Sequence, residues 1–303
     1  MTAALFSTNV LVWGFTWIAI AYQLGEAPVE VALLYRFVLA VGTLALVLAA
    51  TGRLRRIAWR HQPYLALAGL CMFGVNYVLV YHGTKHLATG VVALLFSTAT
   101  IFNAFNSALF FRERPSGRFL AGAALGTGGL ACLFARDLAG LDFAGATLTG
   151  AGLVIAGTYS FSLGNMVARR NDRAGLDLAT ACTWSMAWGT GFLALYALAK
   201  GSALPLDLSI SFVVALLYLA VPGTAVGFLA YLEIVRRLGA PTAAFSTVLY
   251  PVIALAVSTV VEGYRWTPEG ALGLLLILGG NVLVFAPAPL LHRAAATLAF
   301  RQS

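Results

Sequence analysis

The chain has 303 residues, of which 60% are hydrophobic and 10% are charged, with a formal net charge of +8 and a mean hydropathy of +0.88. Soluble domains carry about 25% charged residues, so this composition excludes an ordinary soluble protein and predicts a membrane protein. The positive charge does not indicate nucleic-acid binding, because the basic residues lie in short gaps between apolar runs and form no single basic face.

A helix that crosses a bilayer needs about 20 mostly apolar residues, because unpaired backbone groups cannot be left in hydrocarbon. Breaking the chain at its charged and Pro- or Gly-bearing gaps predicts an all-α membrane protein with ten transmembrane helices. The expected ranges are 3–22, 30–51, 64–84, 89–111, 117–135, 146–168, 177–199, 210–233, 240–261 and 267–287.

The basic residues predict the orientation of these helices, since Lys and Arg collect on the cytoplasmic side of short loops. Fourteen of the 19 basic residues fall in alternate gaps beginning with Arg53, and four fall in the other gaps. The remaining one, Arg36, lies within the 30–51 range. We therefore expect a multi-pass membrane protein with both termini in the cytoplasm.

Part of the sequence is repeated. Residues 90–113, "GVVALLFSTATIFNAFNSALFFRE", align with residues 239–262, "GAPTAAFSTVLYPVIALAVSTVVE", at an offset of 149, so that Phe-Ser-Thr at 96–98 recurs at 245–247. The following helices match at an offset of 151, Gly122 with Gly273 and Gly128-Gly129 with Gly279-Gly280. These matches predict two five-helix repeats, 1–140 and 141–290, followed by a short cytoplasmic tail, 291–303.

A repeat of five helices is odd, so the second copy enters the membrane inverted. Inverted repeats are characteristic of secondary transporters, whose substrate site lies near the midplane between the copies. The architecture therefore predicts transport by alternating access.

These segments also resemble a known family. The stretch "RPSGRFLAGAALGTGGLACLFA" after Glu113 and the second-half stretch from Leu238 to Ala286 are similar to the drug/metabolite transporter superfamily, in its EamA-type branch. The resemblance covers nearly the whole chain and implies export of amino acids and other small metabolites across the bacterial inner membrane, with the aromatic and broader amino-acid exporters most similar. One departure is that Pro251 has Phe102 as its counterpart, so any hinge in the 89–111 helix has another origin.

Aromatic pairs at i, i+4 spacing lie on one helix face and predict the walls of a substrate cavity. The alternatives are core packing and, near the ends of spans, an interfacial aromatic belt, which suits Tyr81. The pairs are Trp13 and Trp17, Tyr77 and Tyr81, and Trp184 and Trp188.

Polar residues at membrane depth usually face the bundle interior, either as contacts to substrate or as links between helices. We expect Asn103 to contact substrate or to lock the two halves together. The other candidates for the cavity are Asn76, Ser97, Thr100, Tyr159, Tyr231 and Tyr250, while Ser246 belongs to the second Phe-Ser-Thr.

Arg36 stands about 9 Å inside the predicted outer end of its helix. It could snorkel to the surface, attract a substrate carboxylate from the cavity wall, or bind helix-end carbonyls. Pro222 and Pro251 each remove a backbone hydrogen bond, so we predict that they are hinges or merely structural kinks.

The predicted function is a secondary exporter of small metabolites, most of all amino acids. No carboxylate lies in the middle of a predicted helix, which favours gradient-driven export over obligatory proton antiport. A proton-coupled exporter of drugs or lipophilic cations is the alternative. The sequence has no H-E-x-x-H, G-x-S-x-G or P-loop motif, so we expect neither an intramembrane enzyme nor any cofactor or metal site, and it leaves the oligomeric state open.

Overall fold

The computed structural model describes residues 2–113, 116–133, 145–238 and 249–285. Its regular structure is helical, and no β-strand occurs among these residues. The helices are α1 (Thr2–Ala21), α2 (Val29–Ala50), η1 (Trp59–His61), α3 (Gln62–Gly69), η2 (Leu70–Val75), α4 (Asn76–Thr84), α5 (Thr89–Phe96), α6 (Ala99–Phe111), α7 (Gly117–Leu133), α9 (Ala146–Arg173), α10 (Leu178–Ala199), α11 (Ile210–Ala220), η3 (Val221–Val226), α12 (Gly227–Leu238), α14 (Tyr250–Val261) and α15 (Pro268–Phe285).

Most described helix ends lie close to the predicted ranges, but α9 extends to Arg173 and α12 to Leu238, beyond the predicted ends at 168 and 233. The expected 30–51 and 177–199 ranges correspond to α2 and α10. The second Phe-Ser-Thr, including Ser246, and the predicted tail 291–303 lie outside the described residues.

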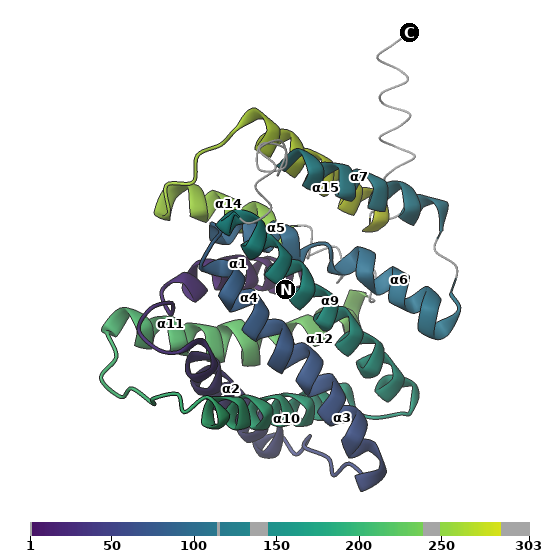
Figure 1. Ribbon diagram of the computed structural model, residues 1–303. Helices are drawn as coiled ribbons and strands as arrows, with labels where there is room; N and C mark the ends of the chain where they lie inside the picture. The colour runs from purple at the N-terminus through teal and green to yellow at the C-terminus, as the bar shows by residue number, and fades with distance from the viewer. Residues whose placement is uncertain (1, 114–115, 134–144, 239–248, 286–303) are drawn as a thin grey trace.

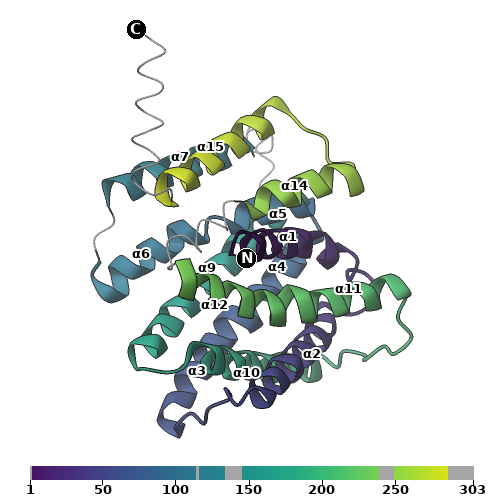
Figure 2. The same cartoon turned by 180° about the vertical axis from the view of Figure 1, so that it is seen from behind.

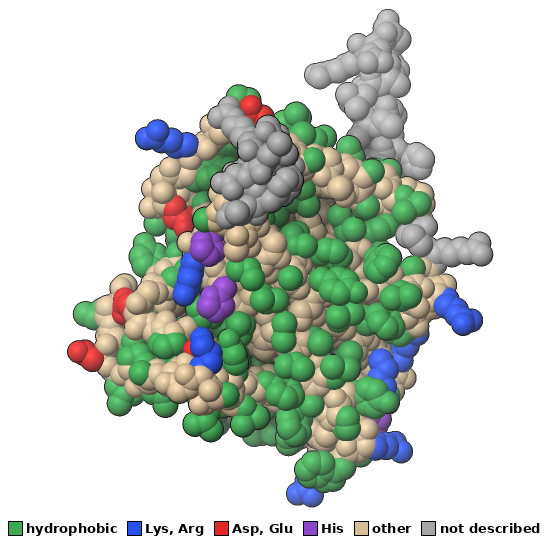
Figure 3. Space-filling view, viewed as in Figure 1, with side chains coloured by type: hydrophobic (Ala, Val, Ile, Leu, Met, Phe, Trp, Pro, Cys, Tyr) green, Lys and Arg blue, Asp and Glu red, His purple; other side chains and the backbone are tan. Residues whose placement is uncertain are grey.

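Several helices have the length and hydropathy needed to cross a membrane. They are Val29–Ala50, Trp59–Thr84, Thr89–Phe111 and Ala146–Arg173, and shorter apolar helices occur at Leu5–Ala21, Gly117–Leu133, Ile210–Val226, Tyr250–Val261 and Pro268–Val284. Hydrophobic side chains cover the broad face between the two charged edges of the molecule (Figure 3). This surface is that of a multi-pass membrane protein.

The helices lie side by side in a bundle (Figure 1). At one end α7 and α15 pack along each other, and at the other end α10 packs against both α2 and α3, as the reverse view also shows (Figure 2). The largest buried cluster includes Phe37 of α2, Phe73 of η2, Tyr81 of α4 and Met186 of α10, and so extends into the end formed by α2 and α10.

Three predicted helices are interrupted. The 64–84 range is divided by the π-helical segment η2, and the 210–233 range by the π-helical segment η3. Leu70 and Val221, at which these segments begin, are 151 residues apart, as are Val75 and Val226, at which they end. The 89–111 range is divided at Ser97 and Thr98, between α5 and α6.

Glycines let several helices approach at backbone distance, as is typical where apolar driving force between membrane helices is absent. A Cβ atom built on Gly122 would lie 2.6 Å from the Gly280 carbonyl oxygen, and one on Gly129 would lie 2.7 Å from that of Gly273. The helices α7 and α15 are therefore antiparallel and in close contact along this line.

An exposed ion-pair cluster joins the end of α6 to α9. The Glu113 carboxylate accepts from Arg169 at 2.7 and 2.5 Å and from Arg173 at 3.2 Å. The hydrogen bonds from Arg169, with the positive charge of both guanidinium groups, hold the pKa of Glu113 below its ordinary value. Any stabilisation from this pair is thus present above the ordinary carboxyl pKa and is lost as the pH falls through the lowered one.

We predict that Gly129→Ala destabilises the protein by about 1–3 kcal/mol, because its methyl group has no room against α15. The neighbouring Gly128 is a matched control, since a Cβ there has no atom within 4 Å. Gly128→Ala is expected to be neutral or slightly stabilising, because alanine favours the helix. Thermal unfolding of both variants in detergent measures the difference, and equal melting temperatures would refute the close contact.

Candidate functional site

A buried arginine is the most unusual feature of the interior. Arg36 lies in α2 and is only 2% exposed. Its Nη1 donates to the Tyr81 hydroxyl at 3.1 Å, and its Nη2 donates to Thr224 Oγ1 at 3.2 Å. The guanidinium carbon also lies 4.8 Å from the centroid of the Tyr77 ring. The side chain is enclosed by protein, which excludes the alternative that Arg36 snorkels to the surface.

This cation is not neutralised by a carboxylate among the described residues. Burying a charge without an opposite charge is costly, which is why buried charges are normally paired. The hydroxyl and aromatic partners of Arg36 are neutral groups and compensate only in part. The site therefore holds a buried positive charge that only neutral groups of the described chain contact.

Two hydrogen-bond donors at this site have no partner within the part of the chain that the structure describes. They are Nε of Arg36 and Nε2 of Gln23. Gln23 itself is 1% exposed, and its Oε1 accepts from the Tyr81 hydroxyl at 2.9 Å. Tyr81 thus links the two donors, and it is fully buried rather than part of an interfacial belt. Unused donors beside a cation suit the acceptor-only oxygens of a carboxylate.

The two π-helical segments position this group. Thr224 belongs to η3, while Tyr77 and Tyr81 lie on α4, directly after η2. The Thr224 hydroxyl also donates to the Leu219 carbonyl at 2.7 Å, which satisfies an acceptor near the break that Pro222 makes in η3. Segments of π-helix occur frequently at functional sites.

A continuous series of aromatic side chains, here called the aromatic wall, runs from Arg36 to α14. Neighbouring ring centroids are 4.8–6.3 Å apart, as expected for favourable aromatic pairs. In order from Arg36 its members are Tyr77, Phe37, Phe73, Phe228, Trp13 and Tyr250, with Tyr231 stacked on Trp13.

Trp13 is the best anchored member of the aromatic wall. Its indole N–H donates to the Gly223 carbonyl of η3 at 3.0 Å. Beside it, Asn9 donates to the Gly227 carbonyl at 3.1 Å and accepts from the Tyr250 hydroxyl at 2.9 Å. The helix α1 thereby satisfies carbonyl groups at and after the break in η3.

Trp17 faces a neighbouring cluster and does not join the aromatic wall through a ring contact. Its ring packs 5.4 Å from that of Phe96, which in turn lies 5.1 Å from Phe161 of α9. Phe96 is the first residue of Phe-Ser-Thr and ends α5. Trp17 therefore connects α1 to the interrupted helix α5–α6.

Polar contacts join α6 to α9 and so join the two predicted halves. Asn165 donates to Asn103 Oδ1 at 3.2 Å, and Asn106 donates to Ser162 at 2.9 Å. Before these contacts along both helices, Tyr159 of α9 makes an edge-to-face contact with Phe102 of α6, the counterpart of Pro251. Asn76, the first residue of α4, donates to the Met72 carbonyl of η2 at 3.1 Å. The Asn76 Oδ1 has no partner among the described residues.

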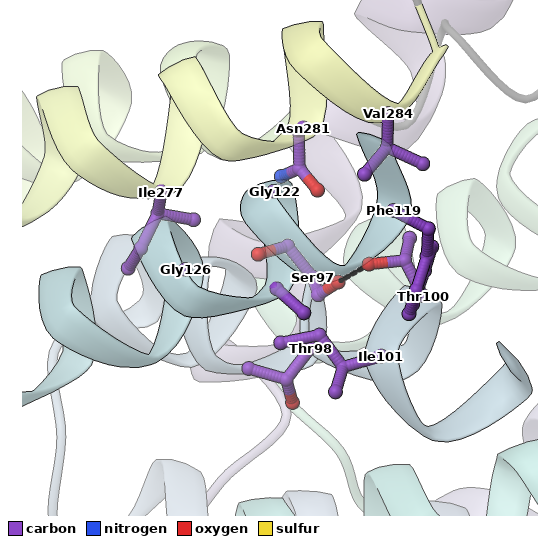
Figure 4. Close-up of a pocket in the computed structure, with 11 residues that line it drawn as sticks. Ser97, Thr98, Thr100, Ile101, Phe119, Gly122, Gly126, Ile277, Asn281 and Val284 are labelled. Carbon is purple, nitrogen blue, oxygen red and sulfur yellow. Dashed lines mark hydrogen bonds between the residues drawn. The ribbon is translucent and has the colours of Figure 1, made fainter. Parts of the chain in front are cut away.

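Hydroxyl groups stabilise the break at Ser97 and Thr98. Ser97 donates to the Leu94 carbonyl and Thr98 to the Leu95 carbonyl, both at 2.7 Å. Thr100 donates to the Ser97 carbonyl at 3.1 Å, the dashed line in Figure 4. The small cavity there, about 10 Å³, lies against α7 and α15 and holds no more than one water molecule. The interruption thus arises from Ser-Thr and needs no proline.

The structure separates three predicted site residues from the others. Trp184 and Trp188 are 40% and 37% exposed on the outer face of α10, which differs from the predicted position on the central cavity. Pro251 lies in the first turn of α14, where a helix tolerates its missing N–H.

Sequence reasoning missed Gln23, Thr224 and Asn9. The first predicted span, 3–22, ends directly before Gln23. An amide side chain at the end of a span could have indicated a buried polar residue. Thr224 follows Pro222 by two residues, so the hydroxyl beside the proline break could have identified it.

Comparisons with known proteins show similarity to transporters over nearly the whole chain. The sequence profile of the EamA-like transporter family matches residues 1–135 and 148–286. A relative named "Probable terminal-alkyne amino-acid exporter" from Streptantibioticus cattleyicolor is 28% identical over 91% of this chain and 90% of its own. An "Uncharacterized transporter" from Archaeoglobus fulgidus is 24% identical over 91% of this chain and 95% of its own.

The fold also has a counterpart among solved structures. A chain described only as "Crystal structure of protein" superposes with a TM-score of 0.66 at 18% identity, over 93% of this chain and 96% of that one. At this identity the likeness shows the fold alone.

We predict that Tyr81→Phe destabilises the protein by about 1–3 kcal/mol, because it removes the hydroxyl that links Arg36 to Gln23 and leaves buried polar groups without a partner. Tyr77→Phe is the matched control, since the Tyr77 hydroxyl has no hydrogen bond in the described structure and its ring stays beneath Arg36. That variant is expected to stay within about 0.5 kcal/mol of the parent protein. Thermal unfolding in detergent compares them, and a Tyr81→Phe variant as stable as Tyr77→Phe would contradict the assigned role.

Proposed function

We propose that this chain, which belongs to the EamA-like transporter family, exports amino acids and similar small metabolites across the bacterial inner membrane by alternating access. The observation that carries the proposal is the buried Arg36, which lacks an acidic partner in the described structure and has an unused donor beside that of Gln23. A substrate carboxylate at this point would neutralise the cation and accept from both groups.

The architecture supports two inverted repeats, 1–140 and 141–290. The segments η2 and η3 are separated by 151 residues, which is the offset of the glycine match between α7 and α15. In the contact between these helices, Gly122 faces Gly280 and Gly129 faces Gly273. Gly273 is the counterpart of Gly122 and Gly280 that of Gly129, so exchanging the repeats maps each contact onto the other. Such reciprocal contacts are those expected about a two-fold axis that passes between the two helices and exchanges them.

The aromatic wall supports a substrate with a sizeable apolar part. An amino acid bound through its carboxylate at Arg36 would lay its side chain along Tyr77, Phe37 and the rings that follow. The relative named as an amino-acid exporter is consistent with that class. Of the predicted cavity residues, those proposed as substrate contacts are Trp13, Trp17, Arg36, Tyr77, Tyr81, Tyr231 and Tyr250. Those proposed as polar residues between helices that move during alternating access are Asn76, Asn103, Tyr159, Ser97 and Thr100.

We further propose gradient-driven transport with both termini in the cytoplasm. Glu30, the acidic residue in the first turn of α2, is held by Lys200 at 2.9 Å and by Ser202. It is thus engaged in a structural ion pair, where it joins α2 to the end of α10. The alternative, a proton-coupled exporter of lipophilic cations, is disfavoured because a buried Arg36 repels a cationic substrate.

The proposal predicts that wild-type protein in liposomes carries an amino acid but discriminates against the matching amine that lacks the carboxylate. Charge-assisted hydrogen bonds contribute about 1.5–3 kcal/mol, so the amine should compete about 10- to 100-fold more weakly. Uptake of radiolabelled amino acids without an ion gradient, with each amine as competitor, measures the ratio. Equal competition by acid and amine would contradict the proposal that Arg36 binds the substrate carboxylate.

Arg36→Gln should reduce amino-acid transport and abolish this discrimination. Arg265→Gln is the control, since Arg265 is an exposed arginine in the loop between α14 and α15. If transport in the parent protein occurred only with an imposed proton gradient, the gradient-driven mechanism would be replaced by proton coupling.

A further inference from the structure

A groove on the outside of the bundle is separate from Arg36 and the aromatic wall. It has a volume of about 200 Å³ and is lined by Arg56, Ile57, Trp59, Gln62, Trp184 and Trp188. The two tryptophans of α10 stand one turn apart on its exposed face. The other residues come from the loop and the short helix η1 before α3, and from Gln62, the first residue of α3. One arginine thus stands at the rim of a mostly apolar groove.

The apolar floor of the groove continues along the membrane-spanning face of α10. Trp184 and Trp188 are followed on this face by Leu195 and Leu198, which are 64% and 78% exposed. Residues separated by three, four and seven positions share one side of a helix. In a bilayer this stripe lies among lipid tails and leads from the groove toward the other side of the membrane.

Specific contacts hold the polar rim in place. The Arg55 backbone N–H donates to Thr180 Oγ1 at 3.4 Å, and the Thr180 hydroxyl donates to the Asp177 carboxylate at 2.7 Å. The loop is thereby attached to the first turn of α10, directly before the tryptophans. On the floor, the Trp188 indole N–H donates to Gln62 Oε1 at 2.8 Å, which fixes the orientation of that ring.

The charge around the rim is positive. Arg53, Arg55, Arg56 and Arg60 lie within eight consecutive residues that contain no acidic residue. Trp59, beside Arg56, is 84% exposed. Exposed tryptophan next to arginine is typical of the membrane–water interface, where rings lie at headgroup level and basic clusters attract anionic lipid.

We propose that this groove is a binding site for one anionic phospholipid of the leaflet that the Arg53–Arg60 loop faces. The headgroup phosphate accepts hydrogen bonds from the Arg56 guanidinium at the rim, and Trp59 lies at the level of the headgroup. An acyl chain covers Trp184 and Trp188 and continues along the exposed face of α10. The charge of the rim selects an anionic headgroup over a zwitterionic one.

The test uses the full-length protein in detergent micelles, to which phosphatidylglycerol or phosphatidylcholine with the same acyl chains is added. Native mass spectrometry counts the lipids that stay bound. We expect phosphatidylglycerol to be retained at least fivefold more than phosphatidylcholine, and Arg56→Gln to remove this preference. Trp184→Ala is expected to reduce the retention of both lipids at least threefold.

The chain offers a matched control on another loop. Arg265 and Trp266 are an exposed arginine and tryptophan that line neither pocket described above. Arg265→Gln and Trp266→Ala should leave lipid retention unchanged. An equal loss in the Arg265 and Arg56 variants would show general surface electrostatics and overturn the site.

Two other results would also overturn the proposal. Retention of phosphatidylglycerol that survives Arg56→Gln would mean that the arginine does not recognise the headgroup. A dimer that dissociates in Trp184→Ala, measured by light scattering, would mean that the groove is covered by a second copy of the chain and not by lipid. The lipid measurement does not depend on the proposed substrate, so the proposed transport function and the proposed lipid site are tested separately.

Discussion

The fold depends on one constraint: in hydrocarbon every backbone N–H and C=O needs a partner within the protein. Unbroken helices meet this constraint by themselves, but this bundle interrupts helices at η2, at η3 and at Ser97-Thr98. Side chains take over at each of these places. Trp13 and Asn9 bind carbonyl groups at and after η3, Thr224 binds one just before it, and Ser97 and Thr98 bind those at the end of α5. At η2 the Asn76 and Ser160 side chains donate to the Met72 and Cys71 carbonyl groups. Each of these interruptions in the described helices is thus accompanied by a polar side chain that binds its backbone.

Arg36 connects two of these interruptions, η2 and η3. It reaches from α2 to Thr224 in η3 and to the tyrosines that follow η2. A buried cation is expensive, and hydroxyl and aromatic partners lower that cost without cancelling the charge. The same contacts that hold the arginine therefore leave it attractive to an anion. A change at either π-helical segment would alter its surroundings, which couples the proposed binding site to the parts of the helices that are easiest to deform.

Aromatic residues have two different roles in this molecule. In the aromatic wall, Trp13 is anchored by a hydrogen bond to η3 and packed against rings from α12 and α14. On α10, Trp184 and Trp188 have the same i, i+4 spacing but lie on the exposed side. The glycines explain the difference, because Gly69 of α3 meets the backbone of Ser185 and Gly189 and thereby sets which face of α10 is packed.

The sequence by itself determined the class of protein, the approximate positions of the apolar helices and the resemblance to EamA-type transporters, while the two inverted repeats remain a prediction. Each of the three depends on local properties: composition, hydropathy over about 20 residues and the residues of short motifs. Periodicity placed the aromatic pairs on shared helix faces, but it left open whether such a face is a cavity wall, core packing or an interfacial belt. It could not distinguish Trp184 from Trp13, nor a snorkelling Arg36 from a buried one. Only the tertiary structure decided these points, because burial and partners depend on which helix faces which, and contacts such as Arg36 with Thr224 join residues 188 positions apart.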